Sequence, residues 1–496
     1  MSRENQIIEN RMKKIEELRN IGINPYPHKF DVKNYAFELH EKYKKLKNDK
    51  KTKDKVSIAG RVMIKRDMGK ISFATLQDSS GKIQIISQEK ETPKKIFEMF
   101  KKYVDTGDFI GINGNIIKTK SGELSILIKR MEILSKAILP LPEKWHGLID
   151  KEERYRKRYL DLVMNSEVKN VFLKREKIIN IIRNFLKERR FNEVETPALQ
   201  SVYGGASATP FKTHLNALDI DLFLSISPEL YLKRLIVGGF EKVFTIGKNF
   251  RNEGIDSTHN PEFTMMEFYI AYADYEYLMK ITEDLIKEIL NKLKIKNPIE
   301  YQGKKLNFLK IKRLKFIDIV KKEIGIDITR ENNFDRLKNA IYRSKINTIN
   351  VNNCKHYGAL LDELYKRTIR PKIIQPTFLT HYPVEMIALA KRNQNNPRII
   401  NTFQLIVDGA EIVKAYDELN DPLEQNERLK EQAKFLHEGD KEAMPIDEDF
   451  ITALKVGMPP TAGYGLGIDR LTMILTNQPS IRDVILFPFM KPEGNK

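Results

Sequence analysis

Residues 56–135 carry five short runs rich in alternating and β-branched residues, and this pattern constrains the fold more than any other feature of the chain. Glycine, aspartate and serine interrupt the runs at DMGK, DSSG and KTKSG, and these residue types close tight turns. Runs of this length and spacing are typical of strands in a small β domain. The five predicted strands cover residues 56–64, 70–78, 82–88, 108–117 and 123–134.

A five-stranded domain of this size resembles the OB-fold, a partly open barrel that binds oligonucleotides through stacking aromatics and a basic groove. By spacing alone, other small β architectures fit equally well. Before the barrel, apolar residues recur near helical spacing over residues 4–20, until the NPYP sequence at 24–27 ends the segment, because proline cannot continue a helix. We therefore expect a basic helical extension over 1–55 and an OB-fold domain over 56–140.

The chain changes character again after the barrel. A proline-led segment becomes strongly charged, which indicates a linker and an entry helix over residues 141–170. A helix is then predicted up to residue 190 and a strand over 191–199, and helices alternate with short strands to the end. At 496 residues the chain exceeds one ordinary domain. We expect one large α+β domain over 171–496, with an insertion near 290–350.

Composition narrows the partners and the location. The net charge is +19, and the first 150 residues carry more than half of it, which favours a polyanionic partner there. An alternative explanation is overall composition: Lys, together with Ile and Asn, is abundant throughout the chain, and this abundance of Lys would produce the positive charge without a binding partner. A single cysteine, Cys354, excludes an internal disulfide and a cysteine-based zinc site. Because no run approaches the roughly 20 apolar residues of a bilayer span and no secretory signal is recognisable, we expect a cytoplasmic protein with no membrane segment.

Two segments combine charged residues with glycine-rich or strand-like sequence. At 244–275 two strand-like runs flank a polar loop, FRNEG…HNPEF, which predicts a hairpin with a fixed array of charges. At 458–475 a glycine-rich turn, GYGLGIDR, precedes an apolar helix; glycines allow close approach to a ligand, and arginine matches phosphate. With ETP at 195–197, and in this order, the segments resemble the three signature motifs of class II aminoacyl-tRNA synthetases. A P-loop motif is absent.

The resemblance narrows to lysyl-tRNA synthetases of the bacterial type. It implies an α+β fold: a catalytic domain on an antiparallel sheet flanked by helices, preceded by a five-stranded OB-fold barrel that binds the anticodon. It also implies an enzyme, a lysine–tRNA ligase that activates L-lysine with ATP to lysyl-adenylate and pyrophosphate and then transfers lysine to the 3′ end of tRNA(Lys). The stretches that carry it are GGASATPF (204–211), SPELYLKRL (227–235), NPEFTMMEFYIAYADY (260–275) and PPTAGYGLGIDR (459–470).

The same resemblance assigns the ATP-binding and catalytic residues. Arg251 would contact the α-phosphate and the lysine carboxylate, and Arg470 would hold the γ-phosphate, both suited by the bidentate geometry of arginine. Phe263 would stack on adenine, Glu253 would lie near the adenine edge, and His259 would lie near the leaving phosphates. Attack of a carboxylate on the α-phosphorus needs positioning and fixed cations but no covalent nucleophile.

For lysine, the resemblance supplies three carboxylates, Glu229, Glu267 and Glu418, with Tyr269 as a hydroxyl partner. Several carboxylates that converge on one point would stabilise an ammonium and reject neutral side chains. An aspartyl enzyme would need cations at this place. Gly205, in the GGAS loop, would close over the bound amino group.

Two positions depart from the family pattern. The family usually has glutamate where this chain has Gln404, and asparagine where it has Lys414. Glu411 would still ligate the Mg²⁺ ion that bridges the ATP phosphates, but Gln404 offers only a neutral carbonyl, so Mg²⁺ affinity is expected to fall. Lys414 would place a second ammonium near that of the substrate or neutralise a pocket glutamate. We predict weakened lysine binding unless Lys414 points away from the cavity.

In the barrel, the resemblance implies that Phe73 stacks on an anticodon base and that Gln84 and Glu123 bind base edges, with Lys65 nearby. Single-stranded loops are read in this way because their bases can unstack onto aromatics. A homodimer through about residues 172–200 is also implied. Two alternatives are a ligase that lysylates a protein, whose relatives lack the barrel, and a catalytically weakened tRNA-binding paralogue.

Overall fold

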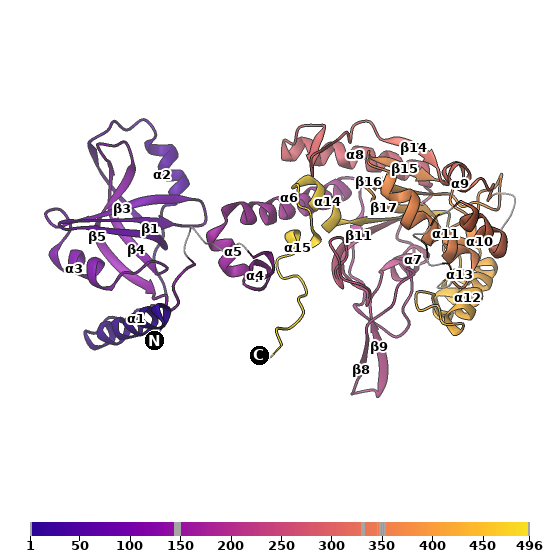
Figure 1. Ribbon diagram of the computed structural model, residues 1–496, viewed down its shortest axis with the longest axis horizontal. Helices are drawn as coiled ribbons and strands as arrows, with labels where there is room; N and C mark the ends of the chain where they lie inside the picture. The colour runs from indigo at the N-terminus through magenta and orange to yellow at the C-terminus, as the bar shows by residue number, and fades with distance from the viewer. Residues whose placement is uncertain are drawn as a thin grey trace. The chain divides into compact units, whose positions relative to one another are not determined.

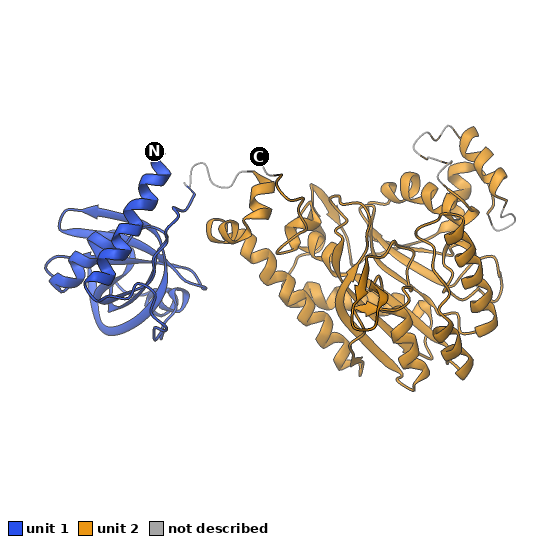
Figure 2. Cartoon of the chain, turned by 90° about the horizontal axis from the view of Figure 1, so that it is seen from below, with its two compact units in different colours: residues 1–148 blue, residues 149–496 orange. Residues whose placement is uncertain are grey.

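The computed structural model describes residues 2–142, 150–328, 333–344, 346, 349, 351 and 354–494. Its chain divides into two compact units, residues 1–148 and 149–496 (Figure 2). Part of the predicted linker, residues 143–149, lies outside the described residues. The same holds for part of the predicted insertion, namely residues 329–332, 345, 347, 348 and 350.

The first unit is built on a closed five-stranded barrel in the order β1-β2-β3-β5-β4, which confirms the predicted barrel. Alternate residues of each strand face inward, so that Ala74 and Leu76 of β2 are buried with Ile83 and Ile85 of β3. Helix α3 (Lys94–Tyr103), absent from the sequence prediction, lies between β3 and β4. The strands are β1 (Lys50–Met68), β2 (Ile71–Gln77), β3 (Lys82–Gln88), β4 (Phe109–Lys118) and β5 (Leu124–Ser135).

Two helices precede the barrel and belong to its unit. Helix α1 (Arg3–Asn20) buries Leu18 against the barrel side, and the buried Arg11 donates hydrogen bonds to three backbone carbonyls. Helix α2 (Ala36–Tyr43) adds Leu39 to the core that fills the barrel. Residues 1–55 therefore take part in the packing of the barrel.

The second unit is built on an eight-stranded sheet in the order β14-β15-β16-β17-β18-β11-β10-β6. Six central strands are antiparallel, and the two edge pairs, β14 with β15 and β10 with β6, are parallel. The predicted antiparallel sheet is thus confirmed for the six central strands. Its strands are β6 (Asn192–Glu193), β10 (Lys242–Phe250), β11 (Glu262–Ala271), β14 (Lys312–Lys315), β15 (Thr377–Thr380), β16 (Thr402–Val407), β17 (Ala410–Asp417) and β18 (Thr461–Gly467).

Helices cover both faces of this sheet (Figure 1). One face packs on α6, α8 and α14, where Phe268 and Tyr464 stack with ring centroids 4.5 Å apart. The other face meets α7 and the helices from α9 to α13. The helices are α4 (Lys151–Arg156), α5 (Arg158–Met164), α6 (Ser166–Glu188), α7 (Glu229–Val237), α8 (Tyr275–Leu293), α9 (Phe316–Ile324), α10 (Phe334–Arg343), α11 (Tyr357–Leu364), α12 (Pro422–His437), α13 (Glu448–Val456), α14 (Ile468–Leu475) and α15 (Ile481–Val484).

Short elements complete the unit. The strand predicted over 191–199 is wrong in extent, because only β6 and β7 are formed there and Pro197, which lacks a backbone donor, stands between them. Strand β7 belongs to a small sheet in the order β7-β9-β8. These elements are β7 (Leu199–Gln200), β8 (Lys212–Leu215), β9 (Ile220–Leu224), β12 (Ile299–Tyr301), β13 (Lys304–Leu306), a π-helix (Tyr365–Ile369) and two 3₁₀ turns (Arg370–Lys372 and Val384–Met386).

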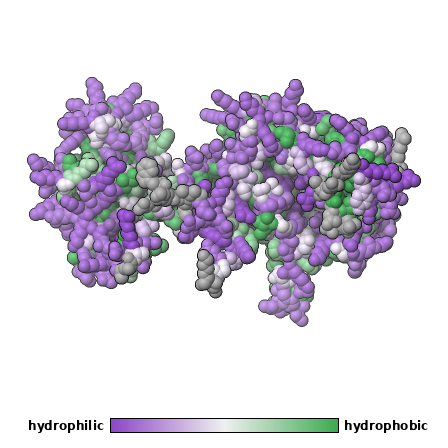
Figure 3. Space-filling view, in the orientation of Figure 1, coloured by the Kyte–Doolittle hydropathy of each residue, from purple (hydrophilic) through white to green (hydrophobic). Residues whose placement is uncertain are grey.

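On the face drawn in Figure 3, both units show mainly hydrophilic side chains, with small scattered apolar areas. Among the residues that the structure describes, no helix is both long enough and apolar enough to cross a membrane.

Candidate active site

Strand β11 supplies one wall of a cavity because its side chains alternate between two faces. Phe263, Met265, Glu267 and Tyr269 occupy alternate positions and line the cavity. Phe268, on the opposite face, belongs to the hydrophobic core. The alternation along this strand of the predicted hairpin thus places the cavity-lining side chains on one face and the core side chains on the other.

Strand β18 forms the floor with three alternating glycines, Gly463, Gly465 and Gly467, all of which line the cavity. A Cβ atom at Gly463 would overlap the Glu418 Oε1 atom and would lie 2.5 Å from Tyr269 Cε1. A Cβ atom at Gly465 would lie 3.1 Å from the Met265 side chain. The glycines are therefore needed for space, and they leave the floor open between the side chains of β11 and β17.

Directly paired residues form a row across the sheet. Gln404 pairs with Lys414, Lys414 with Gly465, and Gly465 with Glu267. A register shift in the β16–β17 pairing inserts one extra residue between Glu411 and Val413, and such a bulge re-aims side chains. As a result, Glu411 and Lys414 both line the cavity.

The cavity has a volume of about 320 Å³ and brings together most of the residues predicted for the site. Glu418 is 1% exposed and lies behind Gly463, so it borders the floor. Gly205 stands beside Glu229: its φ is +84°, and a Cβ atom there would lie 2.8 Å from the Glu229 Cβ. The predicted residues on the lining are Gly205, Glu229, Arg251, Glu253, His259, Phe263, Glu267, Tyr269, Glu411 and Arg470.

Arginines and a histidine cluster at one end of the cavity. Arg251 lies over the ring of Phe263, with its Cζ atom 5.0 Å from the ring centroid. Arg470 donates from NH1 to the carbonyl of Glu411 (3.0 Å), and its NH2 lies 3.1 Å from His259 Nε2. Because arginine can only donate, His259 Nε2 accepts, and the imidazole proton resides on Nδ1.

Asp256 completes the histidine contact. His259 Nδ1 lies 2.9 Å from Asp256 Oδ2. Burial raises the pKa of Asp256, but hydrogen bonds from the Thr258 backbone and from His259 outweigh it and lower the pKa to about 2. The carboxylate is therefore ionised at neutral pH and holds the tautomer whose Nε2 faces Arg470.

Asp469, in helix α14, binds the backbone of the hairpin at strand β11. Its Oδ2 accepts from the Thr264 backbone (2.7 Å), and its Oδ1 pairs with Arg175 of α6 (2.5 Å). Arg175 also donates to Thr264 Oγ1 (3.0 Å). Since Arg470 follows Asp469 directly, this contact sets the place of its guanidinium.

Four buried groups meet at the other end of the cavity. Lys233 is fully buried, and its Nζ lies 2.6 Å from Glu229 Oε1 and contacts Glu418 Oε2. The Tyr416 hydroxyl donates to Glu229 Oε2 (2.7 Å). Glu229 is the first residue of α7, where the helix dipole favours a negative charge. Although burial acts in the opposite direction, the charges of Glu229 and Glu418 raise the pKa of Lys233.

Glu267 is 5% exposed and reaches the cavity between the two ends. Ser227 Oγ donates to its oxygens at 3.1 and 3.3 Å. Burial, reinforced by the charge of Glu229, raises the pKa of Glu267 to about 8. Without a cation beside it, this carboxyl is therefore largely protonated near neutral pH, and a bound cation would favour its ionisation.

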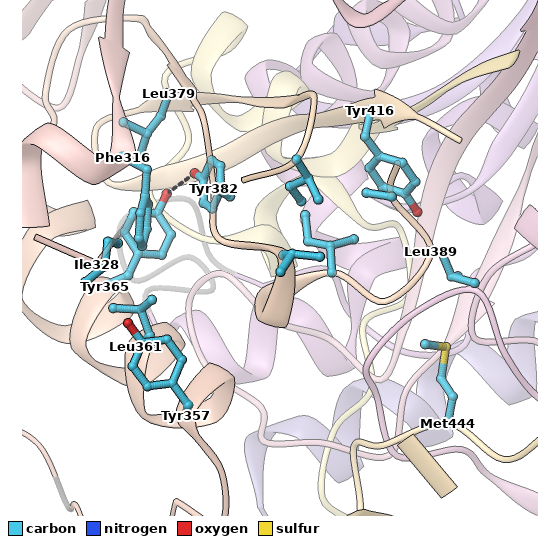
Figure 4. Packing of buried hydrophobic residues seen from close by; sticks show 14 of the residues in the cluster. Phe316, Ile328, Tyr357, Leu361, Tyr365, Leu379, Tyr382, Leu389, Tyr416 and Met444 are labelled. Atoms are coloured by element: carbon cyan, nitrogen blue, oxygen red, sulfur yellow. Dashed lines mark hydrogen bonds between the residues drawn. The ribbon is translucent and has the colours of Figure 1, made fainter. Parts of the chain in front are cut away.

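Gln404 is held by two tyrosines. The hydroxyls of Tyr365 and Tyr382 each donate to Gln404 Oε1 at 2.8 Å, and their own oxygens lie 3.3 Å apart (Figure 4). The two hydroxyls thus occupy the carbonyl that the sequence argument considered as a weak metal ligand. Lys414, its neighbour across the strands, has no ion pair within 4.0 Å among the described residues. The cation that meets the pocket glutamates is Lys233.

The predicted anticodon residues lie on the outer face of the barrel. Phe73 is half-buried in a small cluster with Ile86 and Leu127, separate from the barrel interior. Gln84 Oε1 accepts from Ser125 Oγ (2.7 Å) on the same face, whereas Glu123 is exposed at the start of β5. Lys65 donates to the carbonyls of Lys101 and Val104, which ties its ammonium to the end of α3.

Several residues that complete the site were not predicted from the sequence. Lys233 stands four residues after Glu229, a spacing that places both on one helix face, but such pairs are common on exposed helices. Asp469 lies inside the GYGLGIDR motif, so that motif could have directed attention to it. Nothing in the local sequence connects Tyr416 with Glu229. The residues missed are Ser227, Lys233, Asp256, Tyr416 and Asp469.

Comparison with known proteins agrees with these arrangements. A family model described as tRNA synthetases class II (D, K and N) matches residues 150–491, and a model of the OB-fold nucleic acid binding domain matches residues 56–134. A lysine–tRNA ligase of Carboxydothermus hydrogenoformans is 46% identical over 492 residues, which cover 98% of both chains. Ligases of the same name from Thermotoga maritima and Lactococcus lactis are each 47% identical, over 98% and 97% of this chain and 96% and 97% of their own.

Proposed function

Because the chain belongs to the class II tRNA synthetases and, within them, to the lysine–tRNA ligases, we infer that it activates L-lysine with ATP and transfers it to tRNA(Lys). The observation that carries the choice of amino acid is the pairing of Glu229 and Glu418 at one end of a cavity, with Glu267 next along it and arginines lining the other end. A neutral substrate would gain nothing from buried carboxylates, since each costs free energy to desolvate.

We propose that the lysine ammonium lies against Glu418 and the Tyr269 hydroxyl. Support comes from Glu418 Oε1, a buried oxygen without a hydrogen-bond partner. A buried acceptor left unsatisfied is costly, and an incoming ammonium would satisfy it. Gly205 and Glu267 would hold the α-amino group nearer the centre of the cavity.

The phosphate end provides fixed cations for the activation step. Arg251 would bind the lysine carboxylate and the α-phosphate, so that the attacking oxygen and the phosphorus are brought together. Arg470 would bind the leaving phosphates, and His259 would lie near them and hold the Arg470 guanidinium through Nε2. Phe263 would stack on adenine, with Glu253 at its edge. Because Asp256 holds His259 and Asp469 fixes the first turn of α14 beside Arg470, these two groups need little reorganisation when negative charge develops.

Mg²⁺ is proposed as the cofactor, held by Glu411 together with the ATP phosphates, and it would offset phosphate charge. Magnesium is usually bound by one or two carboxylates plus substrate phosphates, so one free carboxylate fits this role. No cluster of three or more acidic, histidine or cysteine side chains suited to a metal occurs in the described part of the chain. Since tyrosine hydroxyls occupy Gln404 Oε1, the protein would contribute a single carboxylate.

The outer face of the barrel is proposed to read the anticodon, with Phe73 as the stacking platform and Gln84 and Glu123 as contacts to base edges. The half-buried ring is held from below by Ile86 and Leu127, which suits a platform for one base. We also propose a homodimer through residues 172–200 and a cytoplasmic location. Exposed Leu173 and Leu199 are consistent with an interface there.

The test is ATP–pyrophosphate exchange with each of the twenty amino acids, followed by charging of tRNA(Lys). We expect exchange with L-lysine and charging of the tRNA. Exchange without charging would favour a ligase that lysylates a protein. Absence of exchange would favour the tRNA-binding paralogue and would overturn the proposal. Sedimentation of Leu173→Glu beside the parent protein tests the dimer, which we expect to dissociate.

A further inference from the structure

Lys233 is a buried charged group at the amino-acid end for which the reaction has no evident use. Its side chain is fully buried, yet it does not line the cavity, because Glu229 and Tyr416 stand between. The rings of Tyr416 and Phe450 flank its Nζ, with centroids 5.9 and 5.7 Å away. An ammonium in such surroundings is costly unless paired, so its pairing must be accounted for.

The ion pairs of Lys233 leave one carboxylate oxygen of the cluster without a donor. Lys233 contacts Glu229 Oε1 and Glu418 Oε2, one oxygen of each carboxylate. The second oxygen of Glu229 accepts from Tyr416, whereas the second oxygen of Glu418 is buried without a hydrogen-bond partner. Gly463 keeps the space beside that oxygen free. The cluster is thus short of one donor, at the point where Glu418 borders the cavity.

The net charge of Lys233, Glu229 and Glu418 also indicates that the cluster can accept one more cation. Two buried carboxylates without a cation cannot both stay ionised, because like charges at close range retain a proton. Burial raises the pKa of Glu418 well above its usual range, and the charge of Lys233 opposes this rise. With the ammonium and both carboxylates charged, the group would carry one unit of negative charge for a ligand. The other charged or titratable groups around it are Glu267 and Tyr269 from β11, Tyr416 and Asp417 from β17, and Arg251 from the hairpin.

We propose that Lys233 is a positioning residue for substrate selection: it holds Glu229 and Glu418 ionised and oriented, so that one further ammonium completes the cluster. This inference depends on the proposed function, since the ammonium is taken to be that of L-lysine. Lys233 touches no substrate atom; its effect passes through the two carboxylates.

The test replaces Lys233 with methionine, which has a similar length and no charge, in the full-length protein. L-Lysine binding is measured by calorimetry in two buffers of different ionisation enthalpy, which reports the protons released. We expect binding at neutral pH at least about ten-fold weaker, recovering as the pH rises, and about one more proton released than in the parent protein. The KM for ATP should be unchanged within about two-fold. Equal or tighter lysine binding at neutral pH, or equal proton release, would overturn the proposal.

A matched control separates this role from a general effect of removing a buried lysine. Lys136 is also fully buried and bridges two carboxylates, Asp105 and Asp108, in the barrel. Lys136→Met is expected to lower the melting temperature but to leave lysine binding and proton release unchanged. An equal change in lysine binding would contradict the proposal. Lysine-dependent exchange by the parent protein, measured in parallel, reports on the proposed function separately.

A second variant covers the case in which Lys233→Met does not fold. Lys233→Met combined with Glu229→Gln removes one charge of each sign and leaves no unpaired ammonium, so it is expected to fold. It is compared with Glu229→Gln alone, in which Lys233 still holds Glu418. We expect the double variant to bind L-lysine about ten-fold more weakly at neutral pH, because Glu418 then takes up a proton. Equal binding by the two variants would refute the positioning role.

Discussion

The two units of this protein each bury a lysine between two carboxylates, but the two clusters differ in what they leave unsatisfied. In the barrel unit, Lys136 Nζ donates to Asp105, to Asp108 and to the Tyr103 carbonyl, all within 2.7 Å. The second oxygen of Asp108 accepts from the Ala137 backbone (2.8 Å). In the catalytic unit, Glu418 retains one buried oxygen without a donor.

This difference separates a structural cluster from a binding site. A closed set of donors and acceptors stabilises a fold and has no further capacity for a ligand. A set in which one buried acceptor lacks a donor has a cost in free energy, and a ligand that supplies the donor can remove that cost. Buried charge alone therefore does not identify a site; the unsatisfied acceptor beside a cavity does.

We call the cluster of Lys233, Glu229 and Glu418 the open cluster and that of Lys136, Asp105 and Asp108 the closed cluster. The largest expected effect comes from removing a negative charge from the open cluster. Glu418→Gln should raise the KM for L-lysine about 100-fold or more, because breaking a buried pair costs about 3–5 kcal/mol. Lysine-dependent exchange measures this. Asp108→Asn, the counterpart in the closed cluster, should lower the melting temperature and leave this KM unchanged. If both variants changed the KM alike, the distinction between the two clusters would be lost.

Steric closure of the open cluster should have a smaller effect. Gly463→Ala places a methyl group against Glu418 and Tyr269, and overpacking of this kind costs about 1–3 kcal/mol. We expect the KM for L-lysine to rise about ten-fold to 100-fold. Gly247→Ala on β10 is the control, because a Cβ atom there has no neighbour within 4 Å. An unchanged KM for Gly463→Ala would show that the space beside Glu418 is not used.

A substitution in the barrel unit should affect tRNA charging without affecting amino-acid activation. Phe73→Ala is expected to raise the KM for tRNA(Lys) about ten-fold, since stacking of one base is worth about 1–3 kcal/mol, and to leave pyrophosphate exchange unchanged. Phe37→Ala, which removes an aromatic ring that is 61% exposed on α2, is the control and should alter neither assay. Loss of exchange in Phe73→Ala would argue against separate roles for the two units.

The smallest effect expected is a pH dependence confined to the open site. The pKa of Glu267 is raised to about 8, so its ionised fraction grows as the pH rises through that value. Lysine binding requires the ionised form, and its affinity should therefore increase about five-fold between about pH 7 and pH 8. Glu267→Gln should remove this dependence. A flat profile in the parent protein would mean that Glu267 does not bind the substrate.

Elements with strong local signals were predicted well. The five barrel strands and the hairpin of β10 and β11 follow from period-two patterns and turn residues, which act over a few positions. The strand over 191–199 was wrong in extent, because a β propensity does not become a strand without a partner strand along its whole length. Helix α3 lacked a distinct signal beside the stronger strands on either side.

Among the residues of the candidate site, too, those in segments with a strong local signal were predicted and the others were not. The motifs located Arg251, Glu267 and Arg470, because all three lie in segments with unusual sequence. Lys233, which pairs with two pocket glutamates, was not distinguishable from a surface lysine. Lys414, predicted either near the substrate ammonium or against a pocket glutamate, lines the cavity without an ion pair among the described residues. Which lysine meets the glutamates depends on how α7 packs against β10 and β11 of the sheet, and spacing along the chain does not report that.

The sequence by itself determined the class of domain, the order of the motifs and the face on which each side chain of a strand lies, since these follow from local geometry. The tertiary structure alone decided that Glu418 and Lys233, 185 positions apart, share one cluster, and that one of its oxygens has no donor. The physical reason is that burial and satisfaction of a charge depend on every element around it, and packing brings those elements together from distant parts of the chain.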